Sequence, residues 1–549
     1  MTFVLPLLAL LLAGNIYPHR WVWVSRNLSR DQDVEDIRGI AETAARHGLT
    51  GMALSCGLDR LSLQSAAYVE RVRRVKEICD GLGLEIIPNV FSVGYGGSLL
   101  AFDRNLAEGQ PVKDALFVAD GRTARLEPDP AVAFVNGGLE EYDGHKLKGY
   151  SLQDGPGSLS YIDTETFAEG ASSLRFEKLE TAANGNARLM QMVPVRPYRC
   201  YRVSFWVRTR DLEPAGAFRL QVLAPDTTAR ALAPWTAGVA ATAGWRKLVW
   251  GFNSGPYDRV RIYAGTWGAR GGAFWLDGFE IEETGLLNVL RRPGTPVEVR
   301  GEESGTVYQE GGDYGPIVDP RLNHRFDHEA PPLALTAGTR IRPGERLRVS
   351  WYHSLAVNDG QVTVCMSEPR IYEIFREQAR RMHELLGAGR YILSMDEIRA
   401  GGTCEACRRR GLSMAEILGD CITRQMEALR DANPGADIYS WSDMLDPNHN
   451  AHGNYYLVDG DYSGSWNYVP PDLGIITWYY LKRAASLEHF SSLGFRTLAG
   501  AYYDGDTLEN PRGWLEALDR TPGAVGIMYT TWQNKYKLLA DFGDLVSRE

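Results

Sequence analysis

The sequence contains little cysteine and no concentrated positive charge. Seven cysteines are spread over 549 residues, and such an odd, sparse set excludes a disulfide framework. The net charge is −10 and no run of Lys and Arg stands out, so we expect neither nucleic acid nor an anionic membrane as a partner. The chain also has no short-period repeat.

Long apolar runs are equally scarce. The start of the chain, MTFVLPLLALLLAGN (residues 1–15), has the length of a secretory signal peptide and a small residue, Gly14, near its end. It lacks the basic residues that usually precede such a run, so a buried first strand is the alternative interpretation. The run is short for a membrane span, and no later stretch resembles one. We therefore expect a secreted or periplasmic protein without an integral membrane segment.

Aromatic residues, by contrast, are plentiful. The chain has 14 Trp and 26 Tyr, and flat aromatic faces pack against sugar rings, although most Trp in any protein belongs to a core. An apolar content of 44% and a charged content of 23% are those of an ordinary globular protein. A chain of this length forms several domains, or one large barrel with additions.

Residues 16–129 alternate strand and helix signals. RWVWVS (20–25), LTGMALS (49–55) and LEIIPNVFSV (84–93) are strand-like, and each of the two amphipathic segments between them ends at a glycine. Strand, helix, strand, helix, strand indicates parallel βαβ units. We interpret these residues as the first part of a barrel.

The alternation of strand and helix signals stops over residues 130–285. Helix signals are absent there, and short predicted strands alternate apolar and polar residues. This pattern predicts a β-sandwich. The segment GGAFWLDGFEIEE (271–283) resembles the last strand of the carbohydrate-binding jelly rolls that are appended to glycosidases. A purely structural sandwich is the alternative, because a fold does not fix a function. Residues 286–345, rich in Gly and Pro, are interpreted as a connector.

The strand–helix rhythm resumes over residues 346–549, which contain five more strand signals. Together with the first three they make eight, and eight parallel strands with helices between them fit a (β/α)8 TIM barrel. The sequence therefore predicts an α/β protein whose TIM barrel is interrupted after the third strand by a jelly-roll β-sandwich.

The active site of such a barrel lies at the carboxyl ends of its strands. Acids and aromatic residues gather at the ends of the last five predicted strands, and the first strand carries Trp21 and Trp23. Carboxylates ringed by Trp and Tyr at one rim predict a sugar pocket. The residues at these ends are Asp396 and Glu397, Trp441 and Asp443, Trp478, Tyr503 and Asp504, and Trp532 and Gln533.

Asp396 and Glu397 are adjacent, which constrains the chemistry. A retaining glycosidase normally needs two carboxyl groups about 5 to 5.5 Å apart across the scissile bond. Neighbours on one strand are poorly placed for that arrangement. Substrate assistance is the alternative: the carbonyl of a 2-acetamido group attacks the anomeric carbon, Glu397 protonates the leaving oxygen, and Asp396 orients the amide.

The barrel parts of the chain, but not the sandwich, resemble glycoside hydrolase family 20, the β-N-acetylhexosaminidases. The resemblance rests on the segments QVTVCMSEPRIYEIFREQARRMHELLGAGRYILSMDE (361–397), YSWSDM (439–444), AYYD (501–504) and TTW (530–532). The resemblance implies an exo-acting hydrolase without a cofactor or a metal in its site. It implies that Glu397 is the general acid/base, that Asp396 is the acetamido partner and that Tyr503 donates to the acetamido oxygen. Trp441, Trp478 and Trp532 would wall the pocket.

The chain departs from that family at three places. The His-x-Gly-Gly that usually precedes the acid pair is Ile-Leu-Ser-Met here, and Gln533 replaces the acid that follows the last tryptophan. Arg20 is a loose candidate for the family's arginine, which binds the far hydroxyl groups of the sugar. Two other functions stay open: a glycosidase for another sugar with Asp443 or Asp504 as second carboxylate, and a catalytically silent glycan-binding protein.

Cys404 and Cys407 form a single CxxC motif. A zinc site needs two more ligands, which Cys365 and Cys421 could supply. A local disulfide and free thiols are the alternatives.

Overall fold

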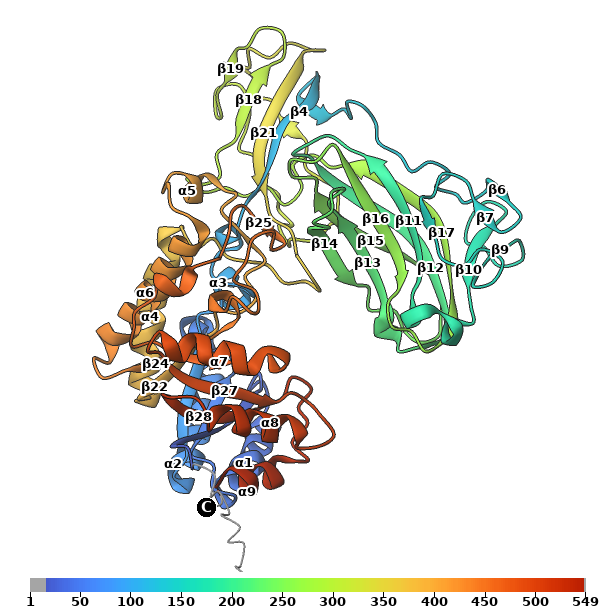
Figure 1. The fold of residues 1–549 in the computed structure, drawn as a ribbon. Coiled ribbons are helices and arrows are strands. Elements are labelled where there is room, and N and C mark those ends of the chain that lie inside the picture. The colour runs from blue at the N-terminus through green and yellow to red at the C-terminus, as the bar shows by residue number, and fades with distance from the viewer. Residues whose placement is uncertain (1–15, 548–549) are drawn as a thin grey trace, which may run out of the picture.

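Strands from both ends of the chain close into a parallel barrel. In the computed structural model, which describes residues 16–547, the strand order is β1-β2-β3-β22-β24-β26-β27-β28, and β28 pairs with β1. Figure 1 shows the blue strands of the first part beside the red strands of the second. The predicted TIM barrel is confirmed. Its strands are β1 (His19–Ser25), β2 (Gly51–Ser55), β3 (Glu85–Val90), β22 (Arg390–Leu393), β24 (Asp437–Trp441), β26 (Gly474–Thr477), β27 (Arg496–Tyr502) and β28 (Ala524–Thr530).

Helices with clear local start and stop signals surround this barrel. The hydroxyl of Ser65 accepts a hydrogen bond from the N–H of Tyr68 at the start of α2, and Gly83 ends that helix in the left-handed region. Between β24 and β26 the chain runs through short 3-10 turns and the small strand β25 (Leu457–Val458). The surrounding helices are α1 (Asp31–Arg46), α2 (Ala66–Leu82), α4 (Pro369–Leu386), α6 (Met414–Ala432), α7 (Arg483–Ser492), α8 (Glu509–Leu518) and α9 (Leu539–Ser547).

Side-chain alternation along the strands separates two layers of core. On β1, Trp21 and Trp23 point into the barrel, whereas Val22 and Val24 pack against the helices. The barrel interior is filled by large side chains, as is usual for a barrel of eight strands. These residues are Trp21, Trp23, Ala53, Ile87, Ile392, Tyr439, Trp441, Ile476, Leu498 and Met528.

The chain between β3 and β22 builds the predicted jelly-roll β-sandwich. Two five-stranded antiparallel sheets face each other, with the orders β15-β12-β17-β10-β9 and β14-β13-β16-β11-β8 (Figure 1, green). The segment GGAFWLDGFEIEE forms β17, the central strand of its sheet. The other strands are β8 (Leu152–Gln153), β9 (Ser160–Asp163), β10 (Ser173–Phe176), β11 (Ala187–Pro194), β12 (Cys200–Glu213), β13 (Phe218–Leu223), β14 (Ala231–Thr236), β15 (Ala243–Asn253) and β16 (Arg259–Thr266).

A third sheet corrects the predicted domain boundaries. Residues 286–345, expected as a connector, contribute strands to a six-stranded sheet of order β19-β18-β21-β4-β5-β20. Strand β4 leaves the barrel and β21 returns antiparallel beside it, so neither belongs to the barrel parts that we assigned to residues 16–129 and 346–549. Pairing of the outgoing and returning chains is non-local and leaves no periodic signal within one segment. The strands are β4 (Gln110–Asp120), β5 (Thr123–Leu126), β18 (Glu298–Gly301), β19 (Val307–Tyr308), β20 (Leu333–Ala334) and β21 (Arg346–His353).

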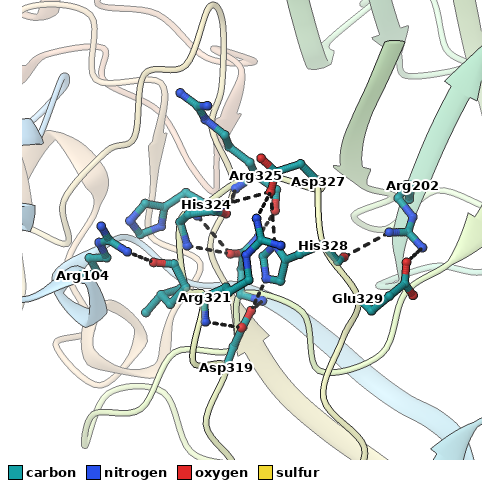
Figure 2. A network of polar contacts seen from close by, with 12 residues as sticks. Arg104, Arg202, Asp319, Arg321, His324, Arg325, Asp327, His328 and Glu329 are labelled. Carbon is teal, nitrogen blue, oxygen red and sulfur yellow. Dashed lines mark hydrogen bonds and ion pairs between the residues drawn. The ribbon is translucent and has the colours of Figure 1, made fainter. Parts of the chain in front are cut away.

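The loop over residues 319–329 ties the three parts of the chain together (Figure 2). Arg104, on the barrel side, donates to the carbonyl of Leu322 at 2.6 Å. Arg202 of the sandwich forms an ion pair with Glu329 at 2.9 Å. Within the loop, buried His328 lies 2.8 Å from the carboxylate of Asp319. The sandwich and the third sheet also share one continuous hydrophobic core.

Among residues 16–547, the helices are either too short or too polar to cross a bilayer. The expected signal peptide, residues 1–15, lies outside the described residues, and secretion stays a prediction.

Candidate active site

A cavity of about 490 Å³ opens at the carboxyl ends of the barrel strands, where TIM-barrel enzymes carry their active sites. All eight strands or the segments directly after them contribute to its wall. Six aromatic residues stand beside ten residues with carboxyl, amide or hydroxyl groups, so the wall offers a small molecule both flat apolar faces and hydrogen-bonding groups. The residues that line it are Trp23, Ser25, Ser55, Gly57, Asp59, Asn89, Val90, Ser92, Tyr95, Ser98, Ser394, Asp396, Glu397, Trp441, Trp478, Tyr503, Thr531 and Trp532.

The acid pair stands directly beyond β22, and both side chains reach the cavity half-buried. The backbone of Glu397 is left-handed, with φ of 51°, a conformation that costs a non-glycine residue roughly 1 to 3 kcal/mol. Gly94, in the loop after β3, passes so close that a Cβ there would lie 2.1 Å from the carbonyl oxygen of Asp396. The turn at the acid pair therefore depends on a glycine from a neighbouring strand.

Three neighbouring residues hold Glu397. The guanidinium of Arg399 lies 2.7 Å from Oε1, and the hydroxyl of Tyr95 donates to Oε2 at 2.5 Å. Gln361 donates to the carbonyl of Glu397 at 2.7 Å and accepts a hydrogen bond from Arg399. Because Gln361 belongs to the segment that returns from the third sheet, the insertion reaches the back of the active site.

Asp396 sits in a less polar position than its neighbour. Its Oδ1 accepts a hydrogen bond of 3.0 Å from the hydroxyl of Ser394. Burial, with the nearby charge of Glu397 adding to it, raises the pKa of Asp396 to about 6. The carboxylate form therefore dominates only above mildly acidic pH.

Asp443 lies beneath the acid pair and does not line the cavity. Its Oδ2 accepts hydrogen bonds from the N–H of Glu397 at 2.8 Å and from the amide of Asn450 at 2.9 Å. Burial, together with the charge of Asp396, raises the pKa of Asp443 to about 8. A buried, protonated carboxyl outside the cavity supports the acid pair from behind, and this placement argues against the second-carboxylate role that the sequence left open.

The aromatic walls form two groups. The rings of Trp23, Trp441 and Trp532 meet pairwise, with centroids 5.4 to 5.9 Å apart. The ring of Tyr503 stacks on that of Trp478 at 6.2 Å. Trp532 is 46% exposed, so one face of the wall is open to a ligand. The structure thus brings Tyr503 and the three predicted tryptophans to the same cavity as Asp396 and Glu397.

Asp504 and Gln533 are not part of this wall. Asp504 accepts hydrogen bonds from the N–H of Trp532 at 2.8 Å, from the N–H of Gln533 at 3.3 Å and from the hydroxyl of Thr531. Its carboxylate is occupied in fixing the loop after β28. Neither side chain lines the cavity, so the substrate-binding role expected of the two residues is not supported by their position.

Arg20 is at the wrong end of the barrel for substrate contact. It is the second residue of β1, and its guanidinium donates to the carbonyls of Gly48 at 2.8 Å and Tyr17 at 2.6 Å. The cavity opens beyond the last residues of that strand. A residue at the start of a parallel strand cannot reach the opposite rim, which corrects our prediction.

The cavity also contains residues that the sequence analysis missed. Asn89 lines it from β3 and Asp59 from the 3-10 turn that follows β2, and Asp59 accepts a hydrogen bond of 3.0 Å from the N–H of Phe91. Burial raises the pKa of Asp59. Examining the ends of the second and third strands as closely as the others would have found both residues. Tyr95 and Arg399 lie on loops, where no pattern marks them.

A group of four residues that could hold a metal ion lies outside the cavity: Glu108, Cys365, Cys404 and Cys407. All seven cysteines are buried and free, so Cys404 and Cys407 form no disulfide. Cys421 is not part of the group; its sulfur lies 3.8 Å from the amide of Gln425 on the same helix.

No protein-family model and no curated protein matches the chain. Among solved structures it is similar to a Flavobacterium johnsoniae chitobiase (8% identity over 97% of this chain and 48% of that one, TM-score 0.38). It is also similar to a rhamnosidase from Novosphingobium sp. PP1Y (11% identity over 94% of this chain and 55% of that one, TM-score 0.32). A family 16 carbohydrate-binding module matches 27% of the chain at 16% identity, covering 97% of the module (TM-score 0.20). The chain spans about half of each glycosidase, and likenesses of this size define no family for it.

Proposed function

We propose that the protein is a glycoside hydrolase, an exo-acting β-N-acetylhexosaminidase-like enzyme with a substrate-assisted, retaining mechanism. One observation carries the proposal: two adjacent carboxyl groups, Asp396 and Glu397, share a single cavity whose wall includes six tryptophan and tyrosine rings. A sugar ring offers flat C–H faces to such rings and hydroxyl groups to the polar atoms between them.

Unpartnered polar atoms in the cavity fit a hydroxylated ligand. Within residues 16–547, Oδ1 of Asn89 and the indole nitrogens of Trp23 and Trp478 have no hydrogen-bond partner. A buried polar group without a partner is costly, typically about 1 to 3 kcal/mol. The three atoms are covered in this conformation, so hydroxyl groups of a bound sugar would complete these hydrogen bonds once the side chains shift on binding.

The roles follow from chemistry at the acid pair. In the first step the acetamido carbonyl oxygen bonds to the anomeric carbon while the glycosidic C–O bond breaks, and Glu397 gives its proton to the leaving oxygen. Asp396 as a carboxylate orients the amide N–H and balances the positive charge of the cyclic intermediate. In the second step Glu397 takes a proton from the water that opens the ring. The hydroxyl group of Tyr503 would donate a hydrogen bond to the acetamido oxygen.

A second candidate is a conventional glycosidase for a sugar without an acetamido group. It is favoured by Asp59, a further carboxyl group in the same cavity. In this mechanism Glu397 is still the acid, and Asp59 is the nucleophile or the base that activates water. Asp59 replaces Asp443 and Asp504 in this role, because neither of those residues lines the cavity.

A panel of aryl β-glycosides tests the proposal. Preferential hydrolysis of 2-acetamido sugars, inhibited by a thiazoline that mimics the cyclic intermediate, is the expected result. Turnover of 2-hydroxy sugars, with a 2-fluoro sugar trapped on Asp59 and found there by peptide mass spectrometry, would establish the second candidate instead. Absence of hydrolysis across the whole panel, with retained glycan binding, would overturn both and leave a silent binding protein.

A further inference from the structure

Outside the active site, three sulfur atoms and one carboxyl oxygen converge in the buried interior. The ligand atoms of Glu108, Cys365, Cys404 and Cys407 all lie within 4.8 Å of one another, and all four residues are buried. They come from three segments: the chain leaving the barrel before β4, the chain re-entering it before α4, and the short helix α5 (Glu405–Arg408) with its N-cap, Cys404.

The spacing of these atoms is that of a tetrahedral metal site. The sulfur of Cys365 lies 3.4 Å from that of Cys404 and 3.7 Å from that of Cys407. Oε2 of Glu108 lies 3.8 and 3.7 Å from the sulfurs of Cys404 and Cys407. Ligands at a zinc–sulfur distance of about 2.3 Å in a tetrahedron stand about 3.8 Å apart. The sulfurs are far beyond the roughly 2.05 Å of a disulfide.

Glu108 is oriented toward the sulfurs by its own hydrogen bonds. Its Oε1 accepts hydrogen bonds from the N–H of Thr403 at 3.0 Å, from the hydroxyl of Thr403 at 2.9 Å and from the N–H of Cys404 at 3.0 Å. These donors leave Oε2 facing the thiols. Metal-binding carboxylates are commonly fixed by such outer hydrogen bonds. Free cysteines that merely fill a core would not need a buried carboxylate aimed at them.

We propose that Cys365, Cys404, Cys407 and Glu108 bind one zinc ion as a closed structural site. Three thiolates favour zinc over magnesium or calcium, and four protein ligands leave no open position for catalysis. Arg292, which interacts with Cys404 and forms a 2.9 Å ion pair with Glu368, supplies a positive charge beside the ligands. The inference does not depend on the function proposed for the cavity.

The position of the site gives it a positioning role. Cys365 follows Gln361 by four residues, and Cys404 follows Arg399 by five; both Gln361 and Arg399 contact Glu397. One ion would therefore fix the two segments that hold the acid, at the point where the inserted domains join the barrel. Loss of the metal should loosen the insertion and the acid loop together.

Metal analysis of the purified full-length protein tests the proposal. Elemental mass spectrometry should find about one zinc per chain, and X-ray absorption should show three sulfurs at about 2.3 Å and one oxygen at about 2.0 to 2.2 Å. Cys407→Ser should lose the zinc, whereas Cys421→Ser, a buried free cysteine outside the cluster, should keep it. Thr403→Val, which removes a hydroxyl that contacts Glu108, Gly109 and Gln110 but none of the three sulfurs, should weaken zinc affinity about 10- to 100-fold.

If the cysteine variants fail to fold, measurements on the wild type decide the question. When a mercurial reagent is added stepwise to the protein in the presence of a zinc indicator, the indicator should report release of the ion as the thiols are modified. Protein that holds no zinc even after reduction and addition of the ion would overturn the proposal. So would a disulfide between any two of the three cysteines in non-reducing peptide mass spectra, or equal zinc loss in Cys407→Ser and Cys421→Ser.

Discussion

The backbone N–H of Glu397 donates a hydrogen bond of 2.8 Å to the carboxyl group of Asp443. The bond joins the proposed catalytic acid to a residue of the 3-10 turn that follows the next barrel strand, β24, and it lies below the cavity instead of in it. Because Asp443 is fully buried close to Asp396, the protonation states of the two carboxyl groups influence each other and the stability of the site.

Asp443 should make the protein less stable as the pH rises. Its pKa is raised from an ordinary value of 3.8 to about 8, so the folded state holds a proton that the unfolded state releases. The stabilisation is complete below pH 4 and is lost as the pH rises toward and through about 8. Asp443→Asn mimics the protonated group, so its stability relative to the wild type should increase from pH 5 to pH 8 by at least about 1.4 kcal/mol, the equivalent of one pKa unit. Chemical denaturation at both pH values measures this difference, and parallel pH dependences would contradict it.

Glu397→Gln should abolish the protonation step while leaving binding largely intact. Gln keeps the shape of the side chain but cannot donate an acidic proton, and general acid catalysis is worth about 10² to 10⁴ in rate. Steady-state kinetics should show this loss on a natural oligosaccharide and a smaller one on aryl glycosides with acidic leaving groups. Near-normal turnover of the natural substrate would remove Glu397 from the role.

Asp396→Asn should slow 2-acetamido substrates selectively. The variant cannot balance the positive charge of the cyclising amide, and one such preorganised contact is worth roughly 3 to 4 kcal/mol of transition-state stabilisation. The ratio of kcat/KM for 2-acetamido and 2-hydroxy aryl glycosides measures the effect in both proteins. An equal loss on both substrates would show that Asp396 acts on something other than the acetamido group.

Gly94→Ala should damage the site without touching the substrate. The added Cβ would meet the backbone carbonyl of Asp396 at 2.1 Å, so the acid loop must move. We expect a loss of stability of about 1 to 3 kcal/mol, as for other overpacked sites, and a marked fall in kcat. Gly97→Ala is the matched control, because its Cβ meets nothing within 4 Å. Similar kinetics for the two variants would show that the acid pair tolerates the shift.

The sandwich should fold more stably with the third sheet than alone. Residues 130–285 carry their own alternating apolar pattern, which predicts a soluble, β-rich fragment. The structure shows that their core continues into β4 and β21, so this fragment exposes part of it. A fragment of residues 108–357 should therefore melt at a higher temperature in circular dichroism. If the fragment of residues 130–285 is disordered, the prediction that the sandwich folds alone is wrong. If the two fragments melt at the same temperature, the prediction that the third sheet stabilises the sandwich is wrong. Glycan binding by the sandwich stays a prediction, to be tested by pull-down on insoluble polysaccharides.

Local pattern was enough to predict the barrel. Each of its eight strands is an apolar run of a few residues, and glycines such as Gly83 end the helices between them. Parallel strands bring their carboxyl ends to one rim, so Asp396, Glu397 and the pocket tryptophans could be placed together from their positions along the sequence. These features are determined within windows of about 10 to 20 residues, where hydrophobic periodicity is visible.

Only the tertiary structure decided which polar residues face the cavity and what the loops join. Asp504 follows a strand as Glu397 does, but consecutive left-handed residues from Tyr502 to Asp504 turn its carboxylate away to the loop after β28. Asp59 reaches the cavity from the 3-10 turn that follows β2, and β4 pairs with β21 more than 200 residues later. Glu108 meets Cys404 across a separation of 296 residues. Such contacts are fixed by packing between distant segments, and neither periodicity nor spacing within one segment encodes them.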